Sequence, residues 1–195
     1  FYSSLGNFSK GEALLNHAMT IASPLGDRIL WSQLLNQKSH LCFLQRDYSQ
    51  AVASSEEALL LQRQLKSDAL IVHTLLRLTN ALTQLDEFAR AEQLLDEFEQ
   101  LAIAQHDSRH IGLALGCRCR LLTRQRRFAE LAECSLQAIQ APFIRDHFPF
   151  KLSISLSAVA VALYYGDVAD GVRLGIAIPN CLDRLHSPLS GPEIQ

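Results

Sequence analysis

A six-residue segment, RDYSQA at positions 46–51, recurs in variant form at a fixed distance along this chain. When the copies are aligned on their aromatic position, the aligned residues are Phe8, Tyr48, Phe88, Phe128 and, less closely, Val168. Successive aligned positions are forty residues apart. A fixed period in this range is typical of chains built from stacked structural units. The recurrence therefore predicts a repeat protein in which each unit packs on its neighbours.

The sequence between the copies favours α-helices. In residues 9–23, for example, apolar residues recur at three- and four-residue intervals, which places them on one helical face. Pro24 and Pro142 are expected to end helices, because proline lacks an N–H group and clashes with the preceding turn. The linkers are only a few residues long, so successive helices should be antiparallel neighbours. The predicted helices cover residues 9–23, 28–44, 48–65, 68–85, 88–105, 108–124 and 127–141.

The two ends of the chain carry further predictions. Residues 1–5 should be the last part of a helix whose beginning is missing, as in a fragment of a longer protein. Pro149 is expected to begin a helix that runs to Tyr165, and another helix should start near Val168 and kink or end near Ile178. The repeat domain is therefore assigned to residues 1–186, with turns at 6–8, 46–48, 86–88, 126–128 and 166–168, and residues 187–195 to a flexible tail.

Composition excludes some functional classes. The chain has 18 basic and 20 acidic residues, and its net charge of −2 gives no overall field for nucleic acid or for an anionic membrane. No apolar run reaches the roughly 18 residues of a membrane-spanning helix. The five cysteines form no even set, and their predicted place inside helices fits a reducing compartment, which favours a cytoplasmic location.

The pattern of each unit resembles the tetratricopeptide repeat (TPR). In that family two antiparallel helices are joined by a turn that carries an aromatic residue, followed three positions later by a small residue. Here the corresponding pairs include Phe8/Gly11, Tyr48/Ala51 and Phe88/Ala91, and a further small residue follows at Ala18, Ala58 and Ala138. The resemblance covers nearly the whole chain and implies an all-α fold, with helix hairpins stacked into a right-handed superhelix.

The period differs from that of the usual TPR, which is about 34 residues. Each helix is therefore expected to be longer by most of a turn. The forty-residue variant is similar to the helical repeat domain of bacterial MalT-like transcriptional regulators. HEAT and armadillo repeats have periods of about 40 residues as well, but they lack the turn with the aromatic residue.

The resemblance also indicates where a partner would bind. In TPR proteins the first helix of each unit lines a concave surface, and the turn alignment carries these positions over to this chain. A row of His, Arg and Asn along one surface suits a peptide carboxylate or another anion, because the arginine guanidinium offers a planar set of donors. The alternative is that these residues form ordinary solvated helix faces. The candidate binding residues are Asn36, His40, His73, Arg77, Asn80, Arg120 and Arg124.

No catalytic or metal-binding residue is assigned. The segment from His106 to His110 contains the residue types of a hydrolase triad, but Asp107 and Ser108 are expected to cap a helix there. Cys117 and Cys119 are two positions apart on a helix and point in different directions, so they do not form a zinc site. Cys119 and Cys134 are expected to be core residues and not metal ligands. The basic cluster of residues 118–127 and the acidic helix 86–99 are both interpreted as solvated surface.

Three functions follow as hypotheses, without a cofactor. The first is a non-catalytic protein- or peptide-binding module, the regulatory or interaction part of a larger bacterial signalling or transcription-regulating protein. The second is a domain of a MalT-like regulator that senses a small-molecule effector. The third, an enzyme built on the repeat, has no supporting constellation. Flanking domains of the same chain, or a second copy, are expected to cover the open ends of the array.

Overall fold

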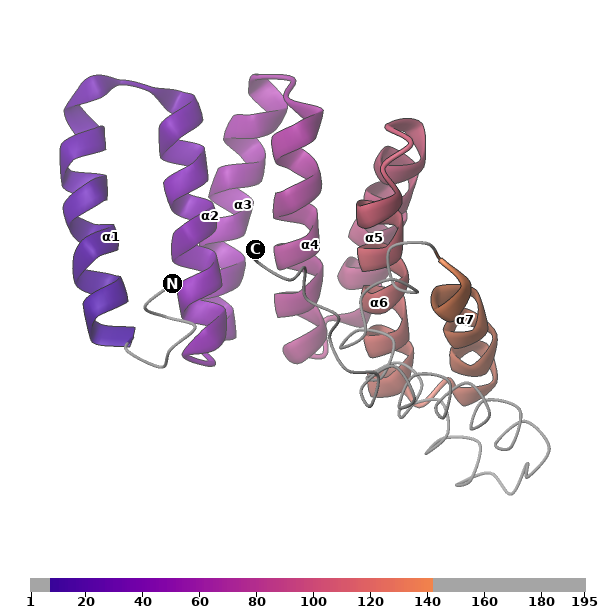
Figure 1. The fold of residues 1–195 in the computed structure, drawn as a ribbon. Helices are drawn as coiled ribbons and strands as arrows, with labels where there is room; N and C mark the ends of the chain where they lie inside the picture. Colours follow the sequence, from indigo (N-terminus) through magenta and orange to yellow (C-terminus); the bar gives the residue numbers. More distant parts are fainter. Residues whose placement is uncertain (1–7, 142–195) are drawn as a thin grey trace, which may run out of the picture.

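The computed structural model describes residues 8–141, which fold into stacked α-helical hairpins (Figure 1). The helices are α1 (Phe8–Ala22), α2 (Arg28–Leu44), α3 (Tyr48–Gln64), α4 (Asp68–Gln84), α5 (Phe88–Ala104), α6 (Ser108–Gln125) and α7 (Phe128–Gln140), and a 3₁₀ turn, η2 (Ser23–Leu25), follows α1. The predicted bounds of these helices are confirmed to within one residue. The predictions for residues 1–7 and 142–195, including the turn at 166–168 and the tail, lie outside the described residues.

The linkers explain why the period is so regular. From α1 to α7, each linker contains one residue in the left-handed region, with φ between 50° and 65°, and these residues follow one another at intervals of twenty: Gly26, Arg46, Lys66, Asp86, His106 and Arg126. In the linker after α2, the N–H of Arg46 donates to the carbonyl of Phe43, and the N–H of Asp47 donates to that of Cys42. This pair of bonds is the Schellman motif, which satisfies carbonyls at the end of a helix. Equivalent bonds close the linkers after α3, α4, α5 and α6.

A single N-cap residue follows each left-handed residue, and the next helix begins directly after that N-cap. Asp27, Asp47 and Asp107 are N-caps, whose carboxylates accept backbone N–H groups in the first turn. The predicted capping role of Asp107 is therefore confirmed. A linker that ends one helix and caps the next within three residues leaves neighbouring helices antiparallel.

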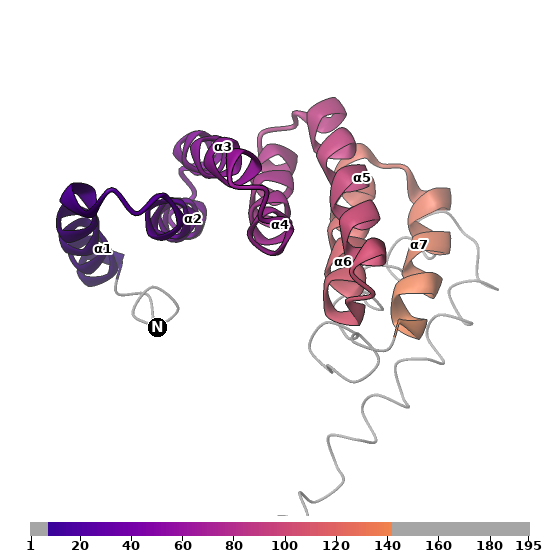
Figure 2. The same ribbon diagram turned by 90° about the horizontal axis from the view of Figure 1, so that it is seen from above.

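The helices form two layers along an arc (Figure 2). In the view from above, α2, α4 and α6 lie along the inner side of the arc, and α3 and α5 lie outside them. The inner helices contact one another, α2 with α4 and α4 with α6. Small residues allow the layers to approach closely, since Ala51, Ala58 and Ala91 are fully buried. This confirms the packing role that their spacing predicts.

Among residues 8–141, the apolar interior is divided into two clusters. The larger one joins α2 to α6 and includes Leu75, Leu78, Leu82, Leu95 and Phe98. The smaller one lies between α6 and α7 and consists of Cys119, Leu122, Leu131, Cys134 and Ala138. Within residues 8–141, no helix is long and apolar enough to cross a bilayer.

Candidate functional site

A hollow of about 330 Å³ lies on the inner side of the arc, where α2, α4 and α6 come together. Residues at three- and four-residue spacing on one helix face the same way, and this spacing brings His73, Arg77 and Asn80 of α4 into the hollow. We call this hollow the inner groove. Its lining residues are His40, Phe43, Leu44, His73, Leu76, Arg77, Asn80, Arg109 and Leu113.

Arg77 has no counter-ion in the described part of the chain. Its guanidinium is partly buried between α2 and α6, and it makes neither an ion pair nor a hydrogen bond with any residue from 8 to 141. Burial lowers its pKa, because a poorly solvated site disfavours the charged form. Arg109 lies in the same groove and likewise has no carboxylate partner among those residues. A partly desolvated guanidinium without a partner is a site that an anion can complete.

The two histidines of the groove favour the neutral form. Burial lowers the pKa of His40, and the charge of Arg77 lowers it further. Burial also lowers the pKa of His73, with smaller contributions from His110, Arg109 and Arg77. At neutral pH the positive charge of the groove therefore belongs to its arginines, and the imidazoles can donate or accept single hydrogen bonds.

Arginines that face the outer helices are paired. Arg63 of α3 pairs with Glu97 of α5, with 2.6 Å between Nη2 and Oε2. Arg118 of α6 bonds Asp96 and Glu99 of α5, both at 2.7 Å. Arg90 pairs with Glu56 and Glu87, and Arg127 with Glu92 and Glu130. Three arginines of the basic cluster, Arg118, Arg124 and Arg127, thus form exposed or partly exposed ion pairs with the acidic helix, a pairing that was not predicted from the sequence.

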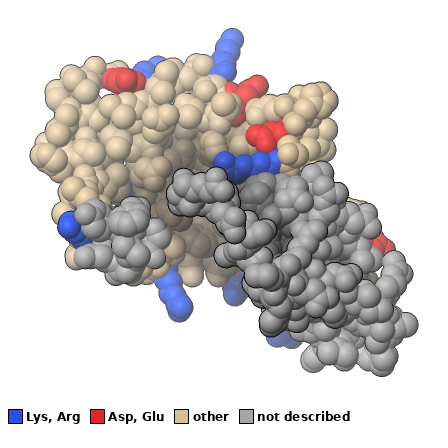
Figure 3. Space-filling model, viewed as in Figure 1, with Lys and Arg blue, Asp and Glu red and all other residues tan. Residues whose placement is uncertain are grey.

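The remaining charges do not gather into a patch of one sign on the face shown in Figure 3. Uncharged side chains dominate that face, and the acidic and basic side chains are scattered over it. This distribution agrees with the small net charge of the chain. The inner groove is distinguished by Arg77, a partly buried arginine without a counter-ion among residues 8–141, and not by a high density of charge.

The structure brings together four of the seven candidate residues. His40, His73, Arg77 and Asn80 all line the inner groove. Arg120 and Arg124 do not line it: Arg120 contacts the sulfur of Cys117 at 3.3 Å, and Arg124 pairs with Asp86 at 2.6 Å. Arg109 also lines the groove, but it is not among the predicted binding residues, because it was considered only as part of the segment 106–110. The sequence feature that could have identified Arg109 as a groove residue is its position four residues before Leu113, on the same face of the helix.

Asn36 lies beneath the surface, contrary to its assignment as a groove residue. Its side-chain nitrogen donates to Oγ1 of Thr74 at 2.6 Å, and that hydroxyl donates to Oε1 of Gln62 at the same distance. Nε2 of Gln62 reaches Oγ of Ser32 at 3.4 Å. All four residues are buried, so Asn36 belongs to a polar network inside the α2–α3–α4 interface. The turn alignment identified the correct helix but could not distinguish an inward polar residue from a groove residue.

The segment from His106 to His110 forms a pair and not a triad. Nδ1 of His110 lies 2.6 Å from Oδ2 of Asp107, and the His110 ring packs edge-on against His73 with 4.8 Å between centroids. His106 is exposed in the linker, and Ser108 is exposed at the start of α6. In the described residues, no group of three or more His, Cys, Asp or Glu side chains could hold a metal ion.

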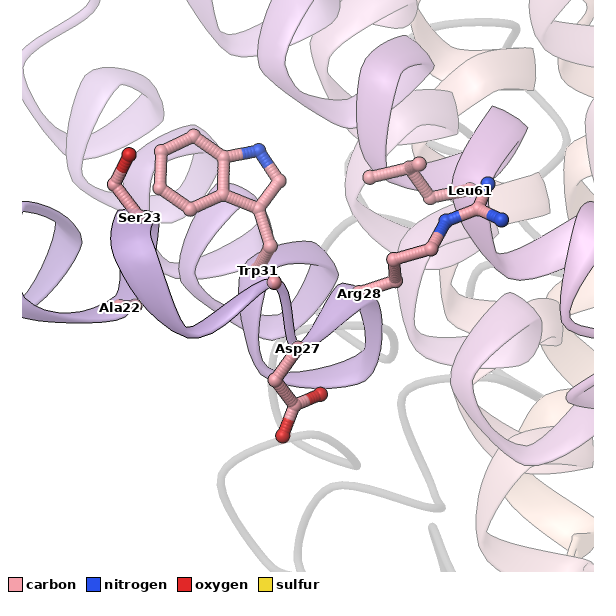
Figure 4. A pocket seen from close by; sticks show the side chains of 7 residues that line it. Ala22, Ser23, Asp27, Arg28, Trp31 and Leu61 are labelled. Atoms are coloured by element: carbon pink, nitrogen blue, oxygen red, sulfur yellow. The ribbon is translucent and has the colours of Figure 1, made fainter.

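A second hollow, of about 170 Å³, lies beside the linker between α1 and α2 (Figure 4). Its polar side chains are engaged locally. Asp27 caps α2, the indole N–H of Trp31 lies 3.4 Å from Glu57, and the guanidinium of Arg28 donates to Gln64. Because these groups already have partners, this hollow is a weaker candidate than the inner groove.

Comparisons with known proteins identify the fold. No protein-family model matches the sequence, and no curated protein matches it significantly. Solved structures do match, and together with the stacked hairpins they define this chain as a TPR-like helical repeat protein. One is BtubC (BKLC) from P. vanneervenii, with a TM-score of 0.82, 15% identity, and coverage of 100% of this chain and 80% of that one. Another is a putative kinesin light chain from P. anserina with nearly identical TPR-like repeats, with a TM-score of 0.74, 14% identity, and coverage of 95% and 92%.

Proposed function

We propose that this chain is a non-catalytic protein-binding module whose inner groove holds an extended segment of a partner protein. The observation that carries the proposal is Arg77, a partly buried guanidinium without a counter-ion in the described residues. A carboxylate of the partner would supply the missing charge. Arg109, on the facing helix α6, can bind the same carboxylate or a neighbouring one.

The walls of the groove suit a peptide. Phe43, Leu76 and Leu113 offer apolar surface for side chains, and the amide of Asn80 can both donate and accept hydrogen bonds. Binding sites of this type combine an apolar lining with a few polar groups that fix orientation. An acidic residue next to an apolar one is therefore the pattern that we expect in the partner.

The test uses peptides displayed from a random library. Selection on the purified chain should enrich segments that contain Asp or Glu, and Arg77→Ala should weaken their binding roughly ten- to hundredfold, since a hydrogen bond to a charged group contributes about 1.5–3 kcal/mol. Arg63→Ala is the matched control, because Arg63 lies on α3 and is paired with Glu97. Equal affinity of the wild type and Arg77→Ala, with both folded by circular dichroism, would contradict the proposal.

A second candidate function is the sensing of a small molecule within a MalT-like regulator. The volume of the groove, about 330 Å³, favours it, because small-molecule sites occupy about 300–1,000 Å³. A ligand that binds only the folded state raises the unfolding temperature in a saturable way. A metabolite that stabilises the wild type but not Arg77→Ala would support sensing, and a screen without such a compound would favour the peptide.

Residues outside the inner groove suggest the cellular setting of the chain. We propose that the chain is the interaction part of a larger cytoplasmic signalling or transcription-regulating protein. The thiols of Cys42, Cys117, Cys119 and Cys134 are free, which fits a reducing compartment. Leu14 and Ile21 of α1 are more than half exposed, at 51% and 55%, and they offer a surface for a flanking domain or a second copy. Light scattering over a range of concentrations distinguishes a dimer from a monomer.

A further inference from the structure

Two cysteines meet across the interface between α6 and α7. The sulfur atoms of Cys119 and Cys134 lie 3.4 Å apart, and the hydroxyl of Ser135 lies 3.8 Å from Cys119. Both thiols are buried, with 5% and 6% of the residue exposed. The proposed binding function does not use them, and they lie outside the inner groove.

The repeat shows that these positions do not require cysteine for packing. The residue forty positions before Cys119 is Thr79, and the one before that is Ser39, whose hydroxyl bonds Ser55 at 2.6 Å. Ser135 is the counterpart of Ser55, and Cys134 is the counterpart of Ser54. Serine therefore fills the same place in another hairpin of this chain, and the pair of thiols adds a chemical property that packing does not need.

We propose that Cys119 and Cys134 form a reversible oxidation site, at which a hydroperoxide converts the two thiols into a disulfide that joins α6 to α7. One cysteine attacks the peroxide oxygen as a thiolate and becomes a sulfenic acid, and the other displaces water from it. In total, the two sulfur atoms give two electrons to one hydrogen peroxide molecule, which is reduced to two water molecules. A dithiol reductant reverses the change by thiol–disulfide exchange.

The surroundings of the pair assign the roles. The hydrogen bond between the two sulfur groups lowers the pKa of Cys119 and raises the pKa of Cys134. The bond to Ser135 lowers the pKa of Cys119 as well, against the effect of burial. Because the hydroxyl of Ser135 lies beside the sulfur of Cys119 and can donate to a thiolate there, we assign the attack on the peroxide to Cys119 and the resolution of the sulfenic acid to Cys134.

Peroxide reaches the pair through local opening. Among residues 8–141, the small apolar cluster around the thiols consists of residues from α6 and α7 and is separate from the larger cluster of α2 to α6. Separation of α7 from α6 therefore breaks the small cluster and leaves the larger one in place, and such sub-global openings are populated well before a protein unfolds as a whole. After closure, the sulfur atoms need to move from 3.4 Å to the bonded distance of about 2.05 Å.

The experiment treats the full reduced chain with hydrogen peroxide, digests it with trypsin without reductant, and analyses the fragments by mass spectrometry. We expect a linked pair of fragments that carries Cys119 and Cys134 and that separates on reduction. The pair should be absent from Cys119→Ser and Cys134→Ser, which the serines at positions 39 and 54 indicate will fold. It should persist in Cys42→Ser, the control.

A second readout is the stability of the oxidised chain. A disulfide that closes a loop of this length should raise the unfolding temperature by roughly 6–12 °C for a chain of this size. Cys119→Ser treated with peroxide should show no rise. Free thiols at both positions after treatment, or a bond from either one to Cys181, would overturn the proposal.

Discussion

The α2–α3 hairpin and the α4–α5 hairpin occupy equivalent places in the repeat, yet different chemistry fills their interiors. Between α2 and α3, the buried side chains include four serines and a glutamine: Ser32, Ser39, Ser54, Ser55 and Gln62. Between α4 and α5, the largest buried side chains are Leu75, Leu78, Leu82, Leu95 and Phe98. Positions forty residues apart make the contrast direct, since Ser55 corresponds to Leu95 and Ala58 to Phe98.

The difference shows which features of the repeat are the same in both hairpins and which vary between them. Both hairpins have the same linkers and the same helix lengths, so the backbone path does not depend on what fills the interior. The polar hairpin depends on the hydrogen bonds that Ser39 makes with Ser55 and Gln62 makes with Thr74 and Ser32, because a polar group that loses its partner in the interior costs free energy. The apolar hairpin depends on volume, because its stability comes from buried surface and close packing.

The largest effect is expected in the apolar hairpin. Phe98→Ala should lower the free energy of unfolding by about 3–5 kcal/mol, because it removes a fully buried ring and leaves a cavity. Urea denaturation followed by circular dichroism measures the change. Leu60→Ala on the exposed side of α3 is the control, and a loss for Phe98→Ala no greater than for this control would contradict the volume argument.

A smaller loss is expected from the polar hairpin. Gln62→Ala should cost about 1–3 kcal/mol, because Thr74 and Ser32 each lose a buried hydrogen-bond partner. The same denaturation experiment applies, with the exposed neighbour Gln64→Ala for comparison. If the two substitutions cost the same, the network around Gln62 does not stabilise the hairpin.

A double-mutant cycle then separates pairing from packing. Ser39→Ala and Ser55→Ala should each cost about 1 kcal/mol, because each leaves the other hydroxyl buried without its bond of 2.6 Å. The double variant should cost clearly less than the sum of the two, since it leaves no unpaired group. Strict additivity would show that the two hydroxyls do not depend on each other.

The smallest effect concerns the backbone that the two hairpins share. Lys66 and His106 lie forty residues apart and both adopt a positive φ, of 52° and 50°. Glycine accepts this conformation without the steric cost that a side chain incurs, so Lys66→Gly and His106→Gly should each stabilise the chain by about 0.5–1 kcal/mol. Similar gains at both sites are expected in thermal unfolding, and gains of opposite sign would show that the linkers are not equivalent.

Most of the fold follows from local sequence signals. The forty-residue recurrence, the apolar spacing and the short linkers were sufficient for the helix bounds of residues 8–141. The left-handed linker residues were less accessible, because only one of the six is glycine and the others carry side chains. Their conformation follows from the hydrogen bonds that end each helix, and not from their own propensity.

The site could be predicted only in part, because a polar residue on a helix does not reveal which face is covered. Asn36 shares the three- and four-residue spacing of a buried face with Ser32 and Ser39, yet its polarity led to its assignment to the groove surface. The ion pairs of Arg118 and Arg124 likewise depend on which helices become neighbours. Arg77 was predicted in the groove, but its lack of a counter-ion among residues 8–141 depends on where all of the described acidic residues lie in the fold.

The identical linkers have a consequence for how such a chain can change its length. Each linker reverses the direction of the chain with a similar backbone conformation. A unit of forty residues can therefore be gained or lost without any change in direction for the helices on either side. A single-residue insertion within a helix, in contrast, would turn every later side chain by about 100° around its axis. Under the proposed function, the reach of the inner groove along an extended partner would therefore change only in whole units, and the number of units would set how many residues of that partner are held at once.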